Sequence, residues 1–237
     1  TLTGLNLNVP VSGGLNQEVT VTYPTVGING LTPGTTSQVS LTSVKYTSGG
    51  TTATITPTVN APTVTLVGSV PTLTVGSGSG SNLNLSAQNK IGSVTVKADS
   101  QGAIKVRQLV FAVSNSGFET GPTILDTPGT TPFLALAGSQ TQISGTSCDY
   151  DSNTVTCTLG TDYASDFLIP ANQQTTFDLY ATVSGAASSG AKAAISTSLA
   201  ASTFLWDDTS TNGASGVALT GTLIYGFPTG SYTISQQ

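Results

Sequence analysis

Two cysteines are the residues of this sequence whose type and spacing point most directly to a chemical event. Cys148 and Cys157 enclose eight residues, and a two-residue turn at Ser152-Asn153 would place them opposite each other in a β-hairpin. At a non-hydrogen-bonded position of such a pair the Cα atoms lie about 4.5 Å apart, within disulfide range. The spacing therefore predicts a disulfide formed in an oxidising compartment, with two buried free thiols as the alternative.

Catalysis has few candidate groups. Histidine is absent, which removes the commonest general base and the usual Ser-His-Asp and Cys-His arrangements. A carboxylate pair of the glycosidase kind is the enzymatic alternative, but the spacing singles out no two acids. The candidates are Asp149, Asp151, Asp162, Asp166, Asp178, Asp207 and Asp208. Because most of them lie in sequences typical of turns, where Asp bonds its own backbone, we expect no enzymatic activity.

The same acids are also candidate metal ligands. Asp149, Asp151 and Asn153 place oxygen atoms at alternate positions, like the start of an EF-hand calcium loop. Thr154 stands where that loop needs glycine, and Gly160 stands where it needs glutamate. Calcium on these three side chains is therefore an alternative to ordinary turn residues, and no other cofactor is expected.

Two features could involve carbohydrate. Asn84-Leu85-Ser86 is the only sequence of the form Asn-x-Ser/Thr, which makes Asn84 the candidate site for a covalent glycan. Five aromatic residues gather late in the chain: Phe204, Trp206, Tyr225, Phe227 and Tyr232. If exposed, they would stack on sugar rings; the apolar alternation around them favours a place in the core.

Charge is scarce. Charged residues make up 7% of the chain, whereas an ordinary soluble domain has roughly 25%. Hydroxyl, amide and backbone groups must therefore keep the surface hydrated, as in many extracellular β-proteins. A net charge of −5 with six basic residues argues against nucleic acid as a partner. No run of about 18 apolar residues is present, so no membrane span is expected.

The charge that exists is unevenly distributed. Residues 1–118 hold five basic and two acidic residues, a net charge of +3, and residues 119–237 hold one basic and nine acidic residues, a net charge of −8. In so charge-poor a chain this arises easily by chance. The functional alternative is that opposite halves of two copies attract each other and steer head-to-tail association.

Alternation with a period of two residues recurs along the chain and predicts an all-β fold. Clear examples are residues 5–9, 18–23, 39–44, 94–97, 104–111, 177–183 and 195–199. Glycine, proline and asparagine turns between them favour an antiparallel, immunoglobulin-like β-sandwich. A proline-bounded segment near residues 60–71 divides the chain into a small N-terminal β module, 1–66, and a larger sandwich module, 67–237. The small module has too few residues for a substantial core of its own.

The first residues of the chain form a candidate donor strand. Leu5, Leu7 and Val9 alternate with asparagine within residues 1–12, so this segment could complete the sheet of a neighbouring copy. The alternative is an ordinary first strand in its own sheet. Because the chain begins at Thr1 without Met, we expect a mature form, secreted after signal-peptide cleavage to the cell surface or beyond.

Three segments carry a resemblance to known modules. They are residues 91–111, the strand entry Ile169-Pro170-Ala171-Asn172 with residues 173–181, and Phe204-Leu205-Trp206-Asp207-Asp208. In this order, over residues 63–230, the chain resembles immunoglobulin-like sandwich modules of prokaryotic surface-layer and extracellular filament proteins, and of large secreted proteins of uncultivated bacteria. The resemblance implies display or assembly and supplies no functional residues.

These observations favour a structural subunit that binds copies of itself. A short two-module unit fits an extracellular filament or pilus-like fibre, assembled by β-strand complementation. A surface-layer lattice subunit and a carbohydrate-binding adhesin module are the alternatives.

Overall fold

The computed structural model describes residues 34–78, 82–127, 129–162, 164–209 and 218–237. Within these ranges the chain forms antiparallel sheets and two short 3-10 helices, Ala201–Thr203 and Gly221–Leu223, and it has no α-helix. The expected all-β fold is therefore confirmed. In the same ranges no helix is long and apolar enough to cross a bilayer.

The first sheet of the sandwich has five strands. In spatial order they are β7 (Thr72–Val75), β8 (Ala87–Lys97), β15 (Gln174–Ser184) and, both on the far side of β15, β10 (Thr123–Ile124) and β11 (Phe133–Leu136). Each pair is antiparallel. The pairing of β8 with β15 is the longest, and it contains one β-bulge at Ile91, since Leu179 pairs with Gly92 and Tyr180 with Lys90.

The second sheet is built around β9, which pairs along its length on both sides. Its main order is β12 (Ser147–Asp151), β13 (Thr154–Thr158), β9 (Ile104–Ser116), β16 (Ala194–Leu199) and β19 (Ser231–Ser235). Three short strands complete it: β14 (Phe167–Ile169) and β17 (Leu205–Asp208) both pair with β9, and β18 (Leu219–Thr220) pairs with β17.

This strand order is that of an immunoglobulin sandwich. In the first sheet, β7, β8, β15 and β10/β11 take the places of strands A, B, E and D, and in the second sheet β9, β16 and β19 take those of C, F and G. Along the chain, the hairpin β12–β13 comes after β10 and β11 and before β15. It extends the second sheet beside β9. The core lies between the sheets because alternate residues point inward: on β15, Phe177, Leu179 and Val183 are fully buried. Each such side chain stabilises the fold by about 1.5–3 kcal/mol.

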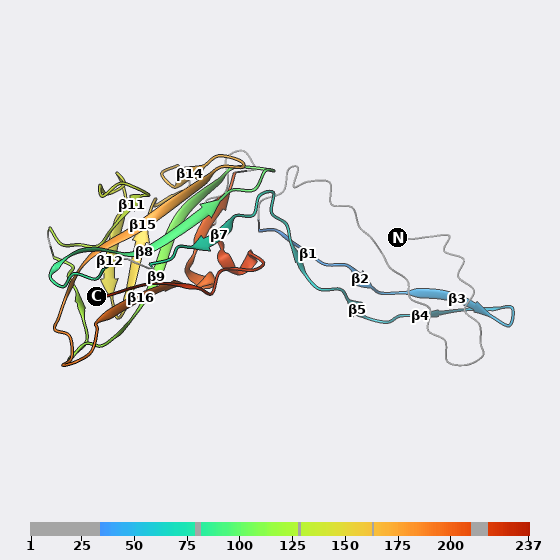
Figure 1. Cartoon of the computed structure of the whole chain (residues 1–237). Helices are drawn as coiled ribbons and strands as arrows, with labels where there is room; N and C mark the ends of the chain where they lie inside the picture. Colours follow the sequence, from blue (N-terminus) through green and yellow to red (C-terminus); the bar gives the residue numbers. More distant parts are fainter. Residues whose placement is uncertain (1–33, 79–81, 128, 163, 210–217) are drawn as a thin grey trace.

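Residues 34–66 form one long β-hairpin, called the ribbon below, which projects away from the sandwich (Figure 1). It has three nested antiparallel pairs: β1 (Thr36–Ser37) with β6 (Val64–Thr65), β2 (Ser40–Leu41) with β5 (Val59–Asn60), and β3 (Val44–Ser48) with β4 (Thr51–Ile55). Gly49 and Gly50 form the two-residue turn at its tip, and both have positive φ, as a type I′ turn requires.

Two prolines account for the interruptions of the ribbon. In each gap between its pairs, the returning strand has one residue more than the outgoing strand, as the registers on either side show. Pro57 lies in the gap between β4 and β5, and Pro62 lies in the gap between β5 and β6. Because proline has no N–H to give to a ladder, an inserted bulge residue accommodates it.

A buried carboxylate fastens the base of the ribbon to the sandwich. The backbone N–H groups of Gly68 and Ser69 both donate hydrogen bonds to Asp208 Oδ2 on β17. The Ser69 hydroxyl, in a residue 1% exposed, donates to the carbonyl of Gly102 at 2.8 Å. Asp208 itself is buried, so these bonds fix the path of the chain as it leaves the ribbon.

The predicted module 1–66 is described only from residue 34 onward. None of residues 34–66 is buried, so this part of the chain has no core of its own. The candidate donor strand within residues 1–12, with Leu5, Leu7 and Val9, lies outside the described residues and stays a prediction.

Candidate assembly surface

The two faces of the ribbon differ in polarity. In β3 and β4 the register sets Val44 opposite Ile55 and Tyr46 opposite Ala53, which gives one face four apolar side chains. This apolar face consists of Val44, Tyr46, Ala53 and Ile55. The opposite face carries Lys45 and threonines, so the tip of the ribbon is amphipathic.

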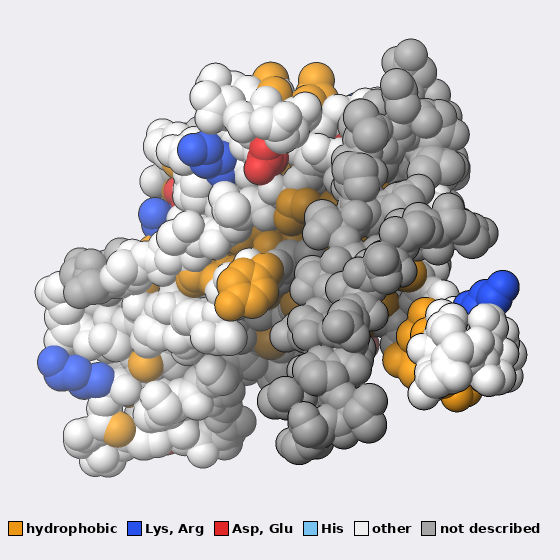
Figure 2. Space-filling view, turned by 90° about the vertical axis from the view of Figure 1, so that its right-hand side faces the viewer, with side chains coloured by type: hydrophobic (Ala, Val, Ile, Leu, Met, Phe, Trp, Pro, Cys, Tyr) orange, Lys and Arg blue, Asp and Glu red, His pale blue; other side chains and the backbone are white. Residues whose placement is uncertain are grey.

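The apolar side chains of the ribbon remain in contact with water. Tyr46 is 46% exposed and Ile55 is 50% exposed. Leu41 and Val59, which are paired in the next segment, are 48% and 57% exposed. Figure 2, which looks at the ribbon from its tip, shows hydrophobic side chains gathered along one side of it. An exposed apolar face of this kind makes the ribbon a candidate interaction surface.

The outer edges of the ribbon strands are a second feature of its surface. Among the described residues, each ribbon strand pairs only with its opposite strand, so a row of backbone N–H and C=O groups is available on either side. A lone two-stranded hairpin is at best marginally stable in water. Within the described part of the chain, the ribbon therefore presents an apolar face and strand edges with which no further strand pairs.

The predicted disulfide is confirmed. Cys148 and Cys157 lie opposite each other in the hairpin β12–β13 and are bonded, with their Cα atoms 4.0 Å apart. Ser152 and Asn153 form the expected two-residue turn, and both have positive φ.

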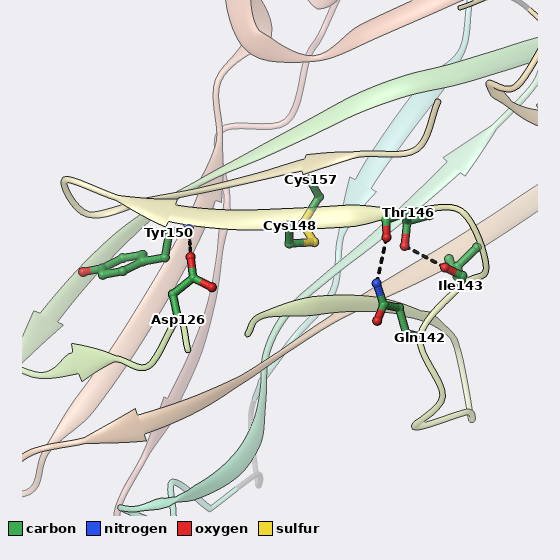
Figure 3. The surroundings of a disulfide bond; sticks show 7 residues. All are labelled: Asp126, Gln142, Ile143, Thr146, Cys148, Tyr150 and Cys157. Atoms are coloured by element: carbon green, nitrogen blue, oxygen red, sulfur yellow. Dashed lines mark hydrogen bonds between the residues drawn. A yellow bond between two sulfur atoms is a disulfide. The ribbon is translucent and has the colours of Figure 1, made fainter. Parts of the chain in front are cut away.

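The disulfide hairpin is also tied to neighbouring segments (Figure 3). The backbone N–H of Tyr150 donates to Asp126 Oδ2 at 3.0 Å, and Gln142 Nε2 donates to the carbonyl of Thr146 at 2.7 Å. These bonds hold β12, an edge strand, at both of its ends. The crosslink and the bonds together fix this corner of the sandwich.

The calcium candidates do not converge. Asp149, Asp151 and Asn153 are exposed, and two of them have local partners: Ser152 Oγ donates to Asp151 Oδ1 and Tyr150 Oη donates to Asn153 Oδ1. Among the described residues, no three acidic, histidine or cysteine side chains gather as a metal site would require. Asp149 and Asp151 lie on β12, and Asn153 lies in the turn that follows it.

One pair of the seven aspartates meets in space, beside β9. Arg107 Nε donates to Asp166 Oδ2 at 3.0 Å, and Arg107 Nη2 donates to Asp207 Oδ2 at 2.9 Å. Both carboxylates are at most 3% exposed. Burial raises the pKa of Asp207 to about 7; the hydrogen bond with Asp166 adds to the rise, and Arg107 opposes it. The pKa of Asp207 therefore lies well above that of an ordinary aspartate.

This pair does not form a carboxylate site that a substrate could enter. A glycosidase sets its two carboxyl groups on either side of a cleft wide enough for a sugar ring. Asp166 and Asp207 are buried and bound to one guanidinium instead. Asp178 is also buried; its Oδ1 accepts a hydrogen bond from Ser93 Oγ at 2.7 Å, and Lys90 Nζ lies 3.5 Å from its Oδ2.

The carbohydrate candidates fall in different places. Phe204, Trp206 and Tyr232 are buried in the core, as the alternation favoured, whereas Tyr225 is fully exposed. The late aromatic cluster is therefore no sugar-stacking platform. Asn84 is exposed, in a turn where Ala87 N–H donates to its carbonyl, so its side chain is accessible to a glycosylating enzyme.

The ribbon and the buried ion cluster were not predicted. Gly49-Gly50 between two stretches rich in threonine and β-branched residues is a hairpin signal that was available. Nothing local signals the cluster, because its acids lie 59 and 100 residues from Arg107.

The fold and this surface define a class of protein, an immunoglobulin-type sandwich that carries a projecting β-ribbon. Neither a family model nor a curated protein sequence matches the chain.

Proposed function

We propose that the protein is the structural subunit of an extracellular filament, in which copies of the chain join by adding β-strands to one another. The observation that carries this proposal is the ribbon, a long hairpin without a core, with an exposed apolar face and outer edges that no other described strand pairs with.

The ribbon has little reason to persist in an isolated monomer. Ordering each residue costs about 1–2 kcal/mol in backbone entropy. None of residues 34–66 is buried to offset that cost, and the apolar side chains remain half in water. A neighbouring copy that covered the apolar face would supply the missing burial.

The shape of the molecule favours an open polymer. A projecting ribbon and a compact sandwich are different surfaces, so a ribbon that binds the sandwich of the next copy makes a heterologous contact. Heterologous contacts that do not close into a ring generate filaments. The disulfide supports an oxidising, extracellular location.

The test replaces the apolar face and keeps the sandwich. Purified wild-type chain and the variant Tyr46→Ser/Ile55→Ser are incubated under identical conditions and imaged by negative-stain electron microscopy. We expect fibres from the wild type and monomers from the variant. The control is Thr47→Ser/Thr54→Ser, which changes the polar face and should still form fibres.

A thermal melt accompanies each variant. Because the ribbon contributes no buried residue, all three chains should unfold at the same temperature. Monomeric wild-type protein, flat sheets instead of fibres, or fibres from the apolar-face variant would each contradict the proposal.

A further inference from the structure

A short pattern at the start of the chain recurs within the sandwich. Thr1-Leu2-Thr3 matches Thr72-Leu73-Thr74, and Asn6-Leu7-Asn8 matches Asn82-Leu83-Asn84. The two internal stretches stand farther apart, since a glycine- and serine-rich segment separates them. Because each match is short, the sequence alone gives it little weight, and the positions of the internal copies decide its meaning.

Both internal copies lie along one side of the sandwich. Thr72–Val75 is β7, the edge strand beside β8. Asn82 forms a parallel bridge with Ser235 of β19, and Leu83 N–H donates to the Ser235 carbonyl at 3.0 Å. Leu73 and Leu83 are both buried, at 8% and 2% exposure. The pattern therefore belongs to segments that lie against β8 in the first sheet and against β19 in the second sheet.

The edge of β8 is covered only in part. β7 pairs with Val94–Lys97, and Gly76 N–H adds one bond to the carbonyl of Ser93. No described strand pairs with Ala87–Ile91 on that side, although β15 pairs along the other.

The ladder shows which backbone groups point to the open side. The carbonyls of Thr176 and Thr182 accept hydrogen bonds from the segments on the side of β15 away from β8. Because backbone groups alternate in direction along a strand, the N–H and C=O groups of the odd-numbered residues of β15 point toward β8. Ala87 and Asn89 are opposite two of these residues and point toward β15. The N–H and C=O groups of Gln88 and Lys90 therefore point outward.

We propose that residues 5–9 of one copy pair with Ala87–Ile91 on the open edge of β8 in the next copy, and so continue the line of β7. The donor has the length of the open stretch and the sequence pattern of the segments already on that side. Leu5, Leu7 and Val9 then occupy one face of the added strand and the asparagines occupy the other. This assignment rests on the proposed filament, and it identifies the edge of β8 as the place where the donor strand of the next copy binds.

The connecting chain is long enough. Residues 10–33 lie between the donor and the base of the ribbon, 24 residues in all. Fully extended they span at most roughly 80 Å. The donor can therefore reach a neighbouring copy, and the experiment must also detect pairing within its own copy.

A crosslink between two kinds of chain tests the contact. Asn8→Cys chain is mixed with tagged Gln88→Cys chain, assembled, oxidised and run on a non-reducing gel. We expect a disulfide-linked heterodimer in most of the assembled material. In the control, Thr141→Cys replaces the acceptor; this exposed residue lies beyond β11, on the other side of the sheet, and should give no such product.

The outcomes separate this inference from the proposed function. Fibres without the crosslink would overturn the acceptor edge and leave the filament standing, whereas the absence of fibres in wild-type protein would overturn the filament. A dilute chain that carries both Asn8→Cys and Gln88→Cys and closes on itself would overturn pairing between copies.

A second variant removes the backbone donor itself. Gln88→Pro deletes the outward N–H of an exposed residue and keeps the bonds of β8 to β15, so the monomer should fold with an unchanged melting temperature. We expect fibre yield to fall at least tenfold, while Gln88→Ala, which keeps that N–H, assembles normally. Normal assembly of a folded Gln88→Pro chain would overturn the proposal.

Discussion

The buried carboxyl pair makes the stability of the sandwich depend on pH in an unusual direction. The folded protein keeps the Asp207 carboxyl group protonated up to about pH 7, because burial and Asp166 raise the pKa of Asp207 from its ordinary value of 3.8. The unfolded chain releases that proton near its ordinary value. Folding therefore binds a proton between these pH values, and the free energy of unfolding falls as the pH rises from about 4 to about 7.

The size of the effect follows from the shift. One pKa unit corresponds to about 1.4 kcal/mol, so a rise from 3.8 to about 7 sets an upper bound of roughly 4 kcal/mol. Relaxation of the structure around ionised Asp207 lowers this bound, and we expect a loss of about 2–4 kcal/mol between pH 4 and pH 8. Hydrogen bonds from Ser165 lower the pKa of Asp162 from its ordinary value of 3.8. The stability that Asp162 contributes is therefore lost only below about pH 4, outside the range from pH 4 to pH 8.

Urea unfolding at constant ionic strength measures the prediction. Wild-type protein should show a lower midpoint at pH 8 than at pH 5, with an unchanged slope. Asp207→Asn mimics the protonated group, so its midpoint should be nearly equal at the two pH values and at least as high as that of the wild type at pH 8. The exposed Asp149→Asn is the control and should keep the wild-type dependence. A wild type that is more stable at pH 8, or an Asp207→Asn chain that keeps the full dependence, would refute the raised pKa of Asp207.

Three further predictions concern the disulfide, the base of the ribbon and the charge halves. Cys148→Ala/Cys157→Ala should lower the free energy of unfolding by at most about 2–3 kcal/mol, measured by urea unfolding, because the closed loop is short. Asp208→Asn removes the charge that accepts from Gly68 and Ser69, so hydrogen exchange of these two amides should accelerate about tenfold while the core stays protected. If the oppositely charged halves steer assembly, light scattering should show slower fibre growth in 0.5 M salt than in 0.05 M salt, and equal rates would remove that steering.

The sandwich could be predicted from the sequence because its strands bury one face. Residues 177–183 and 195–199 alternate cleanly within β15 and β16, and residues 104–111 of β9 alternate with one shift of register after Val106. The disulfide was predictable for a related reason: its geometry depends on a turn of two residues and needs no information about the rest of the fold.

The ribbon was harder to predict because burial does not constrain it. Its residues alternate in places, but Pro57 and Pro62 shift the register between its segments, and no core fixes which face is apolar along its whole length. The contacts of Arg107 could not be foreseen, since they depend on how β14 and β17 come to flank β9. Long-range pairing of this kind leaves no local pattern.

The strand β17 connects the ion cluster to the ribbon. Asp207 binds Arg107 of the central strand, and the next residue, Asp208, binds the backbone that leads out of the ribbon. Ionisation of Asp207 places a negative charge in a buried site beside Asp166 and Arg107 and weakens the place of β17 beside β9. Because β17 also holds the base of the ribbon, we expect the orientation of the ribbon to become less fixed above pH 7. Fibres that lengthen at pH 5 should therefore do so more slowly at pH 8, and Asp207→Asn should remove most of that difference.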